Sequence, residues 1–206
     1  MIPTARRTQD ERRESTRTAV VDAAVSLFAQ KGAQGATLQD VAAAAGLSKG
    51  AVTYHFTAKD ALVDAALARC AEVLVEGVLE AQHRPDGGAG FVRLRRVLDA
   101  VWSPFAHGRD EARVLADLAA LARHDPRLAP AVSGAYGALV GVLARALDDC
   151  AAALGARLDP PAEDLAPLVL AAALGASLAG PGPAAPDDDD PARETLLRLV
   201  ASRFSL

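Results

Sequence analysis

The chain has 206 residues and a formal net charge of −4, and 51% of its residues are hydrophobic against 23% charged. This composition is typical of a globular protein and excludes a globally disordered chain, a collagen-like fibre and a small disulfide scaffold. Aromatic residues make up only 4% of the chain. Because Ala, Leu and Arg outnumber the residues that fill strands, the composition favours an all-α fold.

The charge is distributed unevenly along the chain. Residues 1–60 carry 8 basic and 6 acidic side chains, whereas residues 61–206 carry 14 and 20. A strongly basic nucleic-acid coat is absent, and any contact with a polyanion is expected in the amino-terminal part. Cys70 and Cys150 stand in Ala- and Leu-rich surroundings without the spacing of metal ligands. They predict reduced thiols in a cytoplasmic protein, with no metal or other cofactor.

The amino terminus is basic but has no features of a signal peptide. Residues 1–13 contain Arg6, Arg7, Arg12 and Arg13 with almost no apolar side chain, which predicts a flexible basic arm. The longest uncharged run, residues 165–186, is interrupted by proline and glycine. We therefore expect no transmembrane helix and no membrane partner.

Helix signals follow one another closely after the arm. An apolar face that includes Val20 and Phe28 predicts a first helix, which Gly32 and Gly35 should end. Thr37, with an acidic residue three positions later, predicts the N-cap of a second helix, which Gly46 should end.

Ser48 predicts the cap of a third, short helix over residues 49–55. A capped helix, a turn with glycine and a second short helix are the helix-turn-helix pattern, whose second helix is of the size that enters the DNA major groove. Thr57 and Asp60 repeat the capping pattern and predict a long helix that reaches about His83.

The remainder of the chain is expected to be helical throughout, without a strand. Proline and glycine divide the expected helices, which cover residues 91–103, 110–122, 128–154, 162–179 and 191–204. We predict two domains, a helix-turn-helix domain at residues 1–58 and a second helical domain at residues 59–206; helix pairs joined by glycine turns also occur in all-α proteins that do not bind DNA.

The run VVDAAVSLFAQKGAQGATLQDVAAAAGLSKGAVTYHFTAKDAL, within Thr18–Leu67, resembles the TetR (tetracycline-repressor-like) family of bacterial transcriptional regulators. The resemblance implies a recognition helix at Ser48–His55, with Val52 and Phe56 in the core. Members often carry an aromatic residue where Thr53 stands, so a contact there is expected to be weaker or replaced. The DNA-contacting residues that the resemblance implies are Thr37, Gln39, Ser48, Lys49, Gly50, Ala51, Thr53, Tyr54, His55 and Lys59.

The resemblance also implies that residues 59–206 bind an effector and dimerise. A helix that is apolar around most of its surface, as residues 165–180 predict, needs cover on two sides, and a second subunit is the simplest cover. The predicted dimer residues are Val169, Leu170, Ala173, Leu174, Leu197, Val200 and Phe204. The effector site is predicted at Leu67, Cys70, Leu74, Trp102, Phe105 and Tyr136, although the aromatic residues among them suit a core equally well.

These features predict a homodimeric repressor that binds a double-stranded DNA operator and is released by a small molecule, although the residues do not distinguish a repressor from an activator. A helical interaction protein of the same fold that has lost DNA binding is the alternative. Catalysis has no support, since neither a nucleophile elbow nor a phosphate-binding glycine loop is present. The acidic run Asp187–Asp190 before Pro191 is better explained as a loop that caps a helix than as a metal site.

Overall fold

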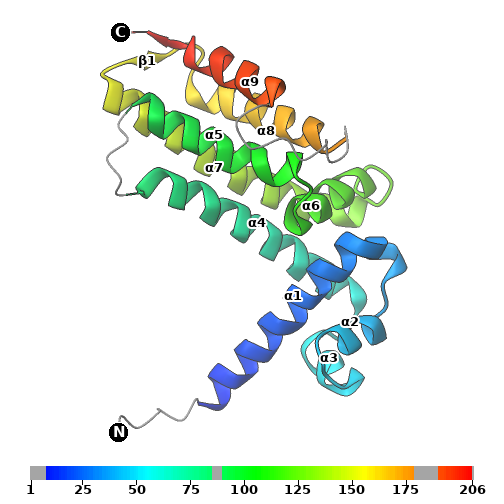
Figure 1. Ribbon diagram of the computed structural model, residues 1–206. Helices are drawn as coiled ribbons and strands as arrows, with labels where there is room; N and C mark the ends of the chain where they lie inside the picture. Colours follow the sequence, from blue (N-terminus) through cyan, green and yellow to red (C-terminus); the bar gives the residue numbers. More distant parts are fainter. Residues whose placement is uncertain (1–7, 85–89, 179–189, 206) are drawn as a thin grey trace, which may run out of the picture.

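The computed structural model describes residues 8–84, 90–178 and 190–205. Nine α-helices account for most of this described part (Figure 1). They are α1 (Gln9–Gly35), α2 (Leu38–Ala44), α3 (Lys49–His55), α4 (Lys59–His83), α5 (Phe91–Ala106), α6 (Asp110–Leu121), α7 (Ala129–Leu154), α8 (Ala162–Leu178) and α9 (Pro191–Ala201). The 3-10 turn η1 (Pro126–Leu128) and the two-residue strands β1 (Arg157–Leu158) and β2 (Phe204–Ser205) complete the order.

The helices form two groups that share α1 and α4. Helices α2 and α3 lie beside α1 at one end of the molecule, and α4 runs from them into a bundle with α5, α7 and α8 (Figure 1). α6 packs on both α1 and α4. The two short helices therefore pack on α1, which in turn packs on α4 of the bundle.

Helix α1 begins earlier than the sequence predicted. The Thr8 hydroxyl accepts a hydrogen bond from the Glu11 N–H (3.2 Å), and the Glu11 carboxylate accepts one from the Thr8 N–H (2.8 Å), which makes a complete capping box. The prediction of a flexible arm is thus wrong from Gln9 onward, while Arg6 and Arg7 lie outside the described residues. Gly32 adopts a φ of 73° and breaks the regular helix as predicted.

Local caps shape the helix-turn-helix as expected, with one exception. Thr37 and Ser48 cap α2 and α3, and Gly46 adopts the left-handed φ of 67° just beyond α2. Thr57, in contrast, does not cap α4. The chain is still extended at Ala58 (φ −138°, ψ 154°), which is the N-cap and makes no side-chain hydrogen bond there, so Thr57 stands one residue too early.

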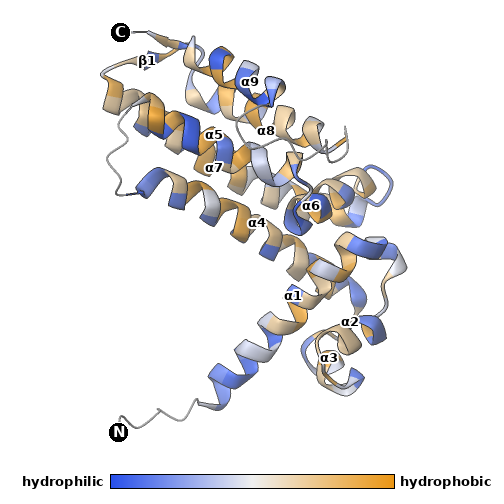
Figure 2. Cartoon of the chain, in the orientation of Figure 1, coloured by the Kyte–Doolittle hydropathy of each residue, from blue (hydrophilic) through white to orange (hydrophobic). Residues whose placement is uncertain are grey.

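The core of the bundle is the apolar stripe of α4 with the facing sides of its neighbours. Leu67, Cys70, Leu74 and Val78 on α4 are all buried. Each buried leucine stabilises the fold by about 1.5–3 kcal/mol relative to an exposed one. Figure 2 shows the contrast between this bundle and the hydrophilic first turns of α1. Among the described residues no helix is long and apolar enough to cross a membrane.

The carboxy-terminal end departs from the all-helical prediction. α9 ends at Ala201, and β2 pairs antiparallel with β1, so that Phe204 lies opposite Leu158. The Phe204 ring also makes an edge contact with Phe91, at 6.1 Å between centroids. The expectation of no strand and of Phe204 on the last helix is therefore wrong, because these long-range contacts hold the chain extended.

Asp190 links the start of α9 to α5. Its side chain accepts hydrogen bonds from the N–H groups of Ala192 (2.9 Å) and Arg193 (3.2 Å) and from Trp102 Nε1 (2.8 Å). The predicted helix cap is thus confirmed, while Asp187 to Asp189 lie outside the described residues. In the described part of the chain, no cluster of three or more His, Cys, Asp or Glu side chains could hold a metal ion. Burial opposes ionisation of Asp190, but these hydrogen bonds outweigh it and lower the pKa of the carboxyl group.

We expect Asp190→Ala to lower the free energy of unfolding by about 1 kcal/mol at neutral pH, through the lost cap. Because the folded-state pKa is depressed, the contribution of Asp190 is complete above its ordinary pKa of about 4 and is lost as the pH falls through the folded-state value. The difference between wild type and variant should shrink in acid. Urea unfolding followed by the fluorescence of Trp102, the single tryptophan, measures this, and the exposed Asp148→Ala is the control. Equal stabilities of wild type and Asp190→Ala at neutral pH would contradict the assignment.

Candidate nucleic-acid interface

Helix α3 presents one face to solvent and anchors the other in the protein. Val52 is fully buried, and Phe56 just after the helix is 3% exposed. On the outer side Lys49 and Gly50 are exposed and Tyr54 is 68% exposed, while Thr53 is half-buried. A two-turn helix fixed in this way can lie in the major groove, because one side is free along its whole length.

Gly50 leaves the backbone of α3 uncovered on the exposed face of the helix. A Cβ atom built at this position would meet only the Ser48 Oγ, at 3.8 Å, which is an ordinary contact. The protein itself therefore does not require glycine here. The absence of a side chain instead allows a partner to approach the helix backbone closely.

The polar side chains predicted to contact phosphates differ in their availability. The Thr37 hydroxyl donates to Asp40 Oδ2 (2.8 Å) and accepts from the Asp40 N–H (3.1 Å). This side-chain hydrogen bond, with that of the Thr37 N–H, lowers the pKa of Asp40. Gln39 is exposed. Lys59 is half-buried, and its Nζ donates to the Gln34 carbonyl oxygen (2.9 Å), which ties the end of α1 to the start of α4.

The Thr53 hydroxyl is turned back onto its own helix. It lies 3.1 Å from the carbonyl oxygens of both Lys49 and Gly50, so it is satisfied within α3. The expectation of a weaker or replaced contact at this position stays a prediction.

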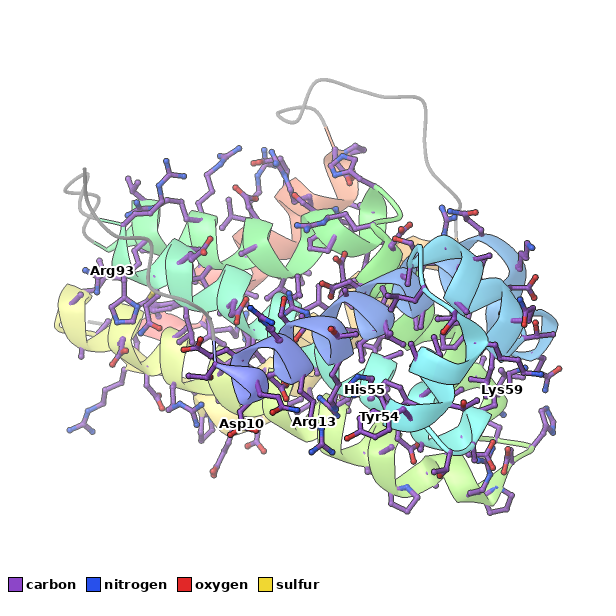
Figure 3. All side chains as sticks on the ribbon, turned by 90° about the horizontal axis from the view of Figure 1, so that it is seen from below. Asp10, Arg13, Tyr54, His55, Lys59 and Arg93 are labelled. Atoms are coloured by element: carbon purple, nitrogen blue, oxygen red, sulfur yellow. The ribbon has the colours of Figure 1, made fainter. Side chains whose placement is uncertain are left out.

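Two arginines of α1 lie over aromatic rings at α3, which the sequence reasoning missed. The Arg13 guanidinium carbon is 5.4 Å from the Tyr54 ring centroid, and that of Arg17 is 5.5 Å from the Phe56 ring centroid. Figure 3 shows Arg13 beside Tyr54 and His55, with Lys59 apart from this group. The spacing of four residues between Arg13 and Arg17 was the available signal, but it has meaning only once the segment is helical.

Polar contacts fasten the interface helices to the bundle. Arg69 of α4 pairs with Asp22 of α1 at 3.1 Å, and Arg127 of η1 pairs with Asp60 in the first turn of α4. A displacement of α4 or η1 would therefore be passed to the helices that carry α3.

The bundle contains a narrow apolar cavity that includes only part of the predicted effector site. Its volume is about 10 Å³, hardly room for one water molecule. Among the predicted residues Leu74 and Phe105 line it, and Leu67 and Cys70 are buried but not in its lining. The complete lining is Leu74, Val78, Ala100, Val101, Phe105, Leu139, Leu143 and Leu170.

Trp102 and Tyr136 lie elsewhere. The Trp102 indole is directed to Asp190, and Tyr136 is 36% exposed with its hydroxyl 3.5 Å from the Pro167 carbonyl oxygen. The three aromatic residues therefore do not form one cluster. Burial also raises the pKa of Cys70 to about 12 and that of Cys150 to about 11, so both remain thiols at neutral pH.

The predicted dimer residues largely face inward. Val169, Leu170, Ala173 and Val200 are each at most 3% exposed within the single chain, where they belong to its core, and their part in a dimer contact stays a prediction. Leu174 and Leu197 are half-buried. The outer sides of α8 and α9 instead carry Leu168, Leu178 and Leu199, which are 64%, 87% and 58% exposed.

Comparison with known proteins identifies the class. Residues 20–66 match the family described as bacterial regulatory proteins, tetR family, and residues 92–205 match the BetI-type transcriptional repressor, C-terminal family. The chain therefore belongs to the TetR family. It is a DNA-binding transcriptional regulator whose carboxy-terminal domain is of a repressor type, and both matched families are families of regulators.

Individual relatives agree with this assignment. The HTH-type transcriptional regulator TtgW of Pseudomonas putida is 37% identical over 103 residues, which are 48% of this chain and 72% of TtgW. A TetR-family regulator from Rhodococcus sp. has the same fold, with a TM-score of 0.73 at 25% identity over 93% of this chain and all of that chain. A regulator from Saccharomonospora viridis, solved in complex with choline, has a TM-score of 0.71 at 21% identity and covers 93% of this chain and 98% of its own.

Proposed function

We propose that this regulator represses transcription by occupying a DNA operator as a homodimer in the cytoplasm, and that a small apolar molecule releases it. The observation that carries the proposal is the outer face of α3. It is a capped, anchored helix on which an exposed Lys49, a side-chain-free Gly50 and an exposed Tyr54 lie together. Such a face lets DNA approach the helix backbone closely, and it offers a positive charge and hydrogen-bonding groups. A helix of this size fits the major groove.

The exposed side chains of α8 and α9 support the homodimer. Leu168, Leu178 and Leu199 are large apolar groups on adjacent helices at the end of the molecule away from α3 (Figure 1). A second copy of the same surface would bury them symmetrically. The two α3 helices would then read half-sites about one turn of DNA apart.

The cavity among α4, α5, α7 and α8 supports the apolar effector. Its lining contains no charged side chain, and sites for small molecules are mostly apolar. Because the cavity is too small for a ligand as it stands, binding must push its walls apart. α4 is one of these walls and also holds α1 and Arg127, so expansion would shift the DNA-binding helices and weaken operator binding.

A cavity-filling variant tests this effector site. We expect Ala100→Leu to weaken operator binding by about tenfold without any effector, because the added side chain needs more room than the cavity of about 10 Å³ offers and so separates its walls as a ligand would. The same side chain occupies the ligand's space, so the effector concentration for further release should rise by about tenfold or more. Release is measured by fluorescence anisotropy of an operator duplex, against a panel of apolar aromatics and organic cations that includes choline. An effector that releases Ala100→Leu at the wild-type concentration would place the site elsewhere.

The DNA-binding proposal is tested by equilibrium binding. A duplex enriched from a random library by the wild-type protein should be bound about a thousandfold or more tightly than a scrambled duplex at the same salt concentration. Equal affinity for the two duplexes would contradict a sequence-specific repressor.

A further inference from the structure

The first turns of α1 lie beside α3 without serving the core. From Gln9 to Ala19 each residue is exposed or half-buried, and Val20 is the first buried residue of the helix. The capping box at Thr8 nevertheless holds this segment helical. The helix therefore fixes the directions in which the side chains of this segment leave the backbone.

Arg13 is the side chain of this segment that reaches α3. Its guanidinium carbon lies 5.4 Å from the Tyr54 ring centroid, and the two groups lie together in Figure 3. A guanidinium held over a ring face keeps N–H donors at its edge, where an acceptor can approach in its plane.

The surroundings of the Arg13 charge differ from those of the Arg17 charge one turn later. Arg17 lies over the buried Phe56 and pairs with Glu14 at 3.6 Å. No acidic side chain in the described part of the chain forms an ion pair with Arg13. Arg17 thus covers the core, whereas the positive charge of Arg13 remains available at the surface.

The position of Tyr54 indicates what Arg13 would meet. Tyr54 is the sixth of the seven residues of α3 and is 68% exposed. A recognition helix contacts base edges mainly through its amino-terminal residues. The end that bears Tyr54 would therefore lie near a groove wall, which consists of phosphates.

We propose that Arg13, held against Tyr54, contacts the DNA phosphate backbone and extends the interface from α3 onto the first turns of α1. This inference rests on the proposed DNA-binding function and adds a second structural element to it. The contact positions the protein without reading sequence, since a phosphate is the same at every base pair.

The test compares Arg13→Gln with Arg12→Gln. Arg12 carries the same charge on the same exposed helix, about 100° around the axis from Arg13. Binding of the wild-type-enriched duplex and of a random duplex is measured over a range of salt concentrations. We expect Arg13→Gln to weaken both duplexes roughly tenfold and to reduce the salt slope by about 0.9 for each bound subunit. Arg12→Gln should change affinity less than about twofold, and Arg13→Lys should keep most of the slope.

Three results would overturn the proposal: an unchanged salt slope in Arg13→Gln, an equal loss in Arg12→Gln, or a loss confined to the enriched duplex, which would mean that Arg13 only positions Tyr54. Gly50→Glu is measured in the same series. If Gly50→Glu still binds the enriched duplex, the proposed function itself fails. If Gly50→Glu does not bind and Arg13→Gln behaves as wild type, only the contact from α1 fails.

Discussion

Gly50→Glu should abolish operator binding while leaving the protein folded. The substitution places a carboxylate on the outer face of α3, where it would meet phosphates and the acceptors of base edges. Like charges at an interface cost several kcal/mol, so a loss of at least about a hundredfold in affinity is expected. Fluorescence anisotropy on the enriched duplex measures this loss.

The structure predicts that this variant folds. The new Cβ meets only the Ser48 Oγ at 3.8 Å, and glutamate is favourable in the first turn of a helix. Gly134→Glu is the matched control, because Gly134 on α7 is exposed with nothing within 4 Å of an added Cβ. Circular dichroism should give the same helicity for both variants. Operator binding by Gly50→Glu at wild-type affinity would remove α3 from the interface.

Leu168→Glu and Leu199→Glu should each convert the protein into folded monomers. Both side chains are exposed in the single chain, at 64% and 58%, so the substitutions should change the stability of the subunit by less than about 0.5 kcal/mol. In a dimer the same carboxylates would be buried without partners, which costs several kcal/mol. Light scattering should show half the wild-type molar mass, and operator affinity should fall because a monomer holds one half-site.

Leu79→Glu provides the control for this experiment. Leu79 is a 38% exposed leucine on α4, so it tests a new surface charge outside α8 and α9. Its mass and operator affinity should equal those of the wild type. A dimeric Leu168→Glu and a dimeric Leu199→Glu together would exclude the α8 and α9 surface.

The sequence was informative about most features that depend on neighbours along the chain, although the Thr57 cap predicted for α4 was wrong. The bounds of α3 follow from the Ser48 cap, and the turn before it follows from Gly46, since both signals act within a few residues. The capping box of Thr8 and Glu11 was equally local. The arginines around it and the lack of apolar side chains are also typical of a flexible arm.

The sequence could not show which side of an apolar helix faces the core. α8 is apolar around most of its circumference, so its pattern gave no reason to place Leu170 inside and Leu168 outside. The sequence also could not show contacts between segments that lie far apart along the chain. Trp102 and Asp190 are 88 positions apart, and only the packing of α9 on α5 directs the indole away from the cavity.

In the proposed dimer the outer face of α3 reads the DNA sequence, and each subunit places its α3 on one half-site. Parallel selections from a random duplex library with the wild type and with Gly50→Glu, followed by sequencing, test it most directly. The wild type should enrich one two-fold symmetric motif, with half-sites about ten base pairs apart or a small multiple of this spacing, and Gly50→Glu should enrich none. A wild-type selection without a motif, or the same motif enriched by both proteins, would contradict the claim.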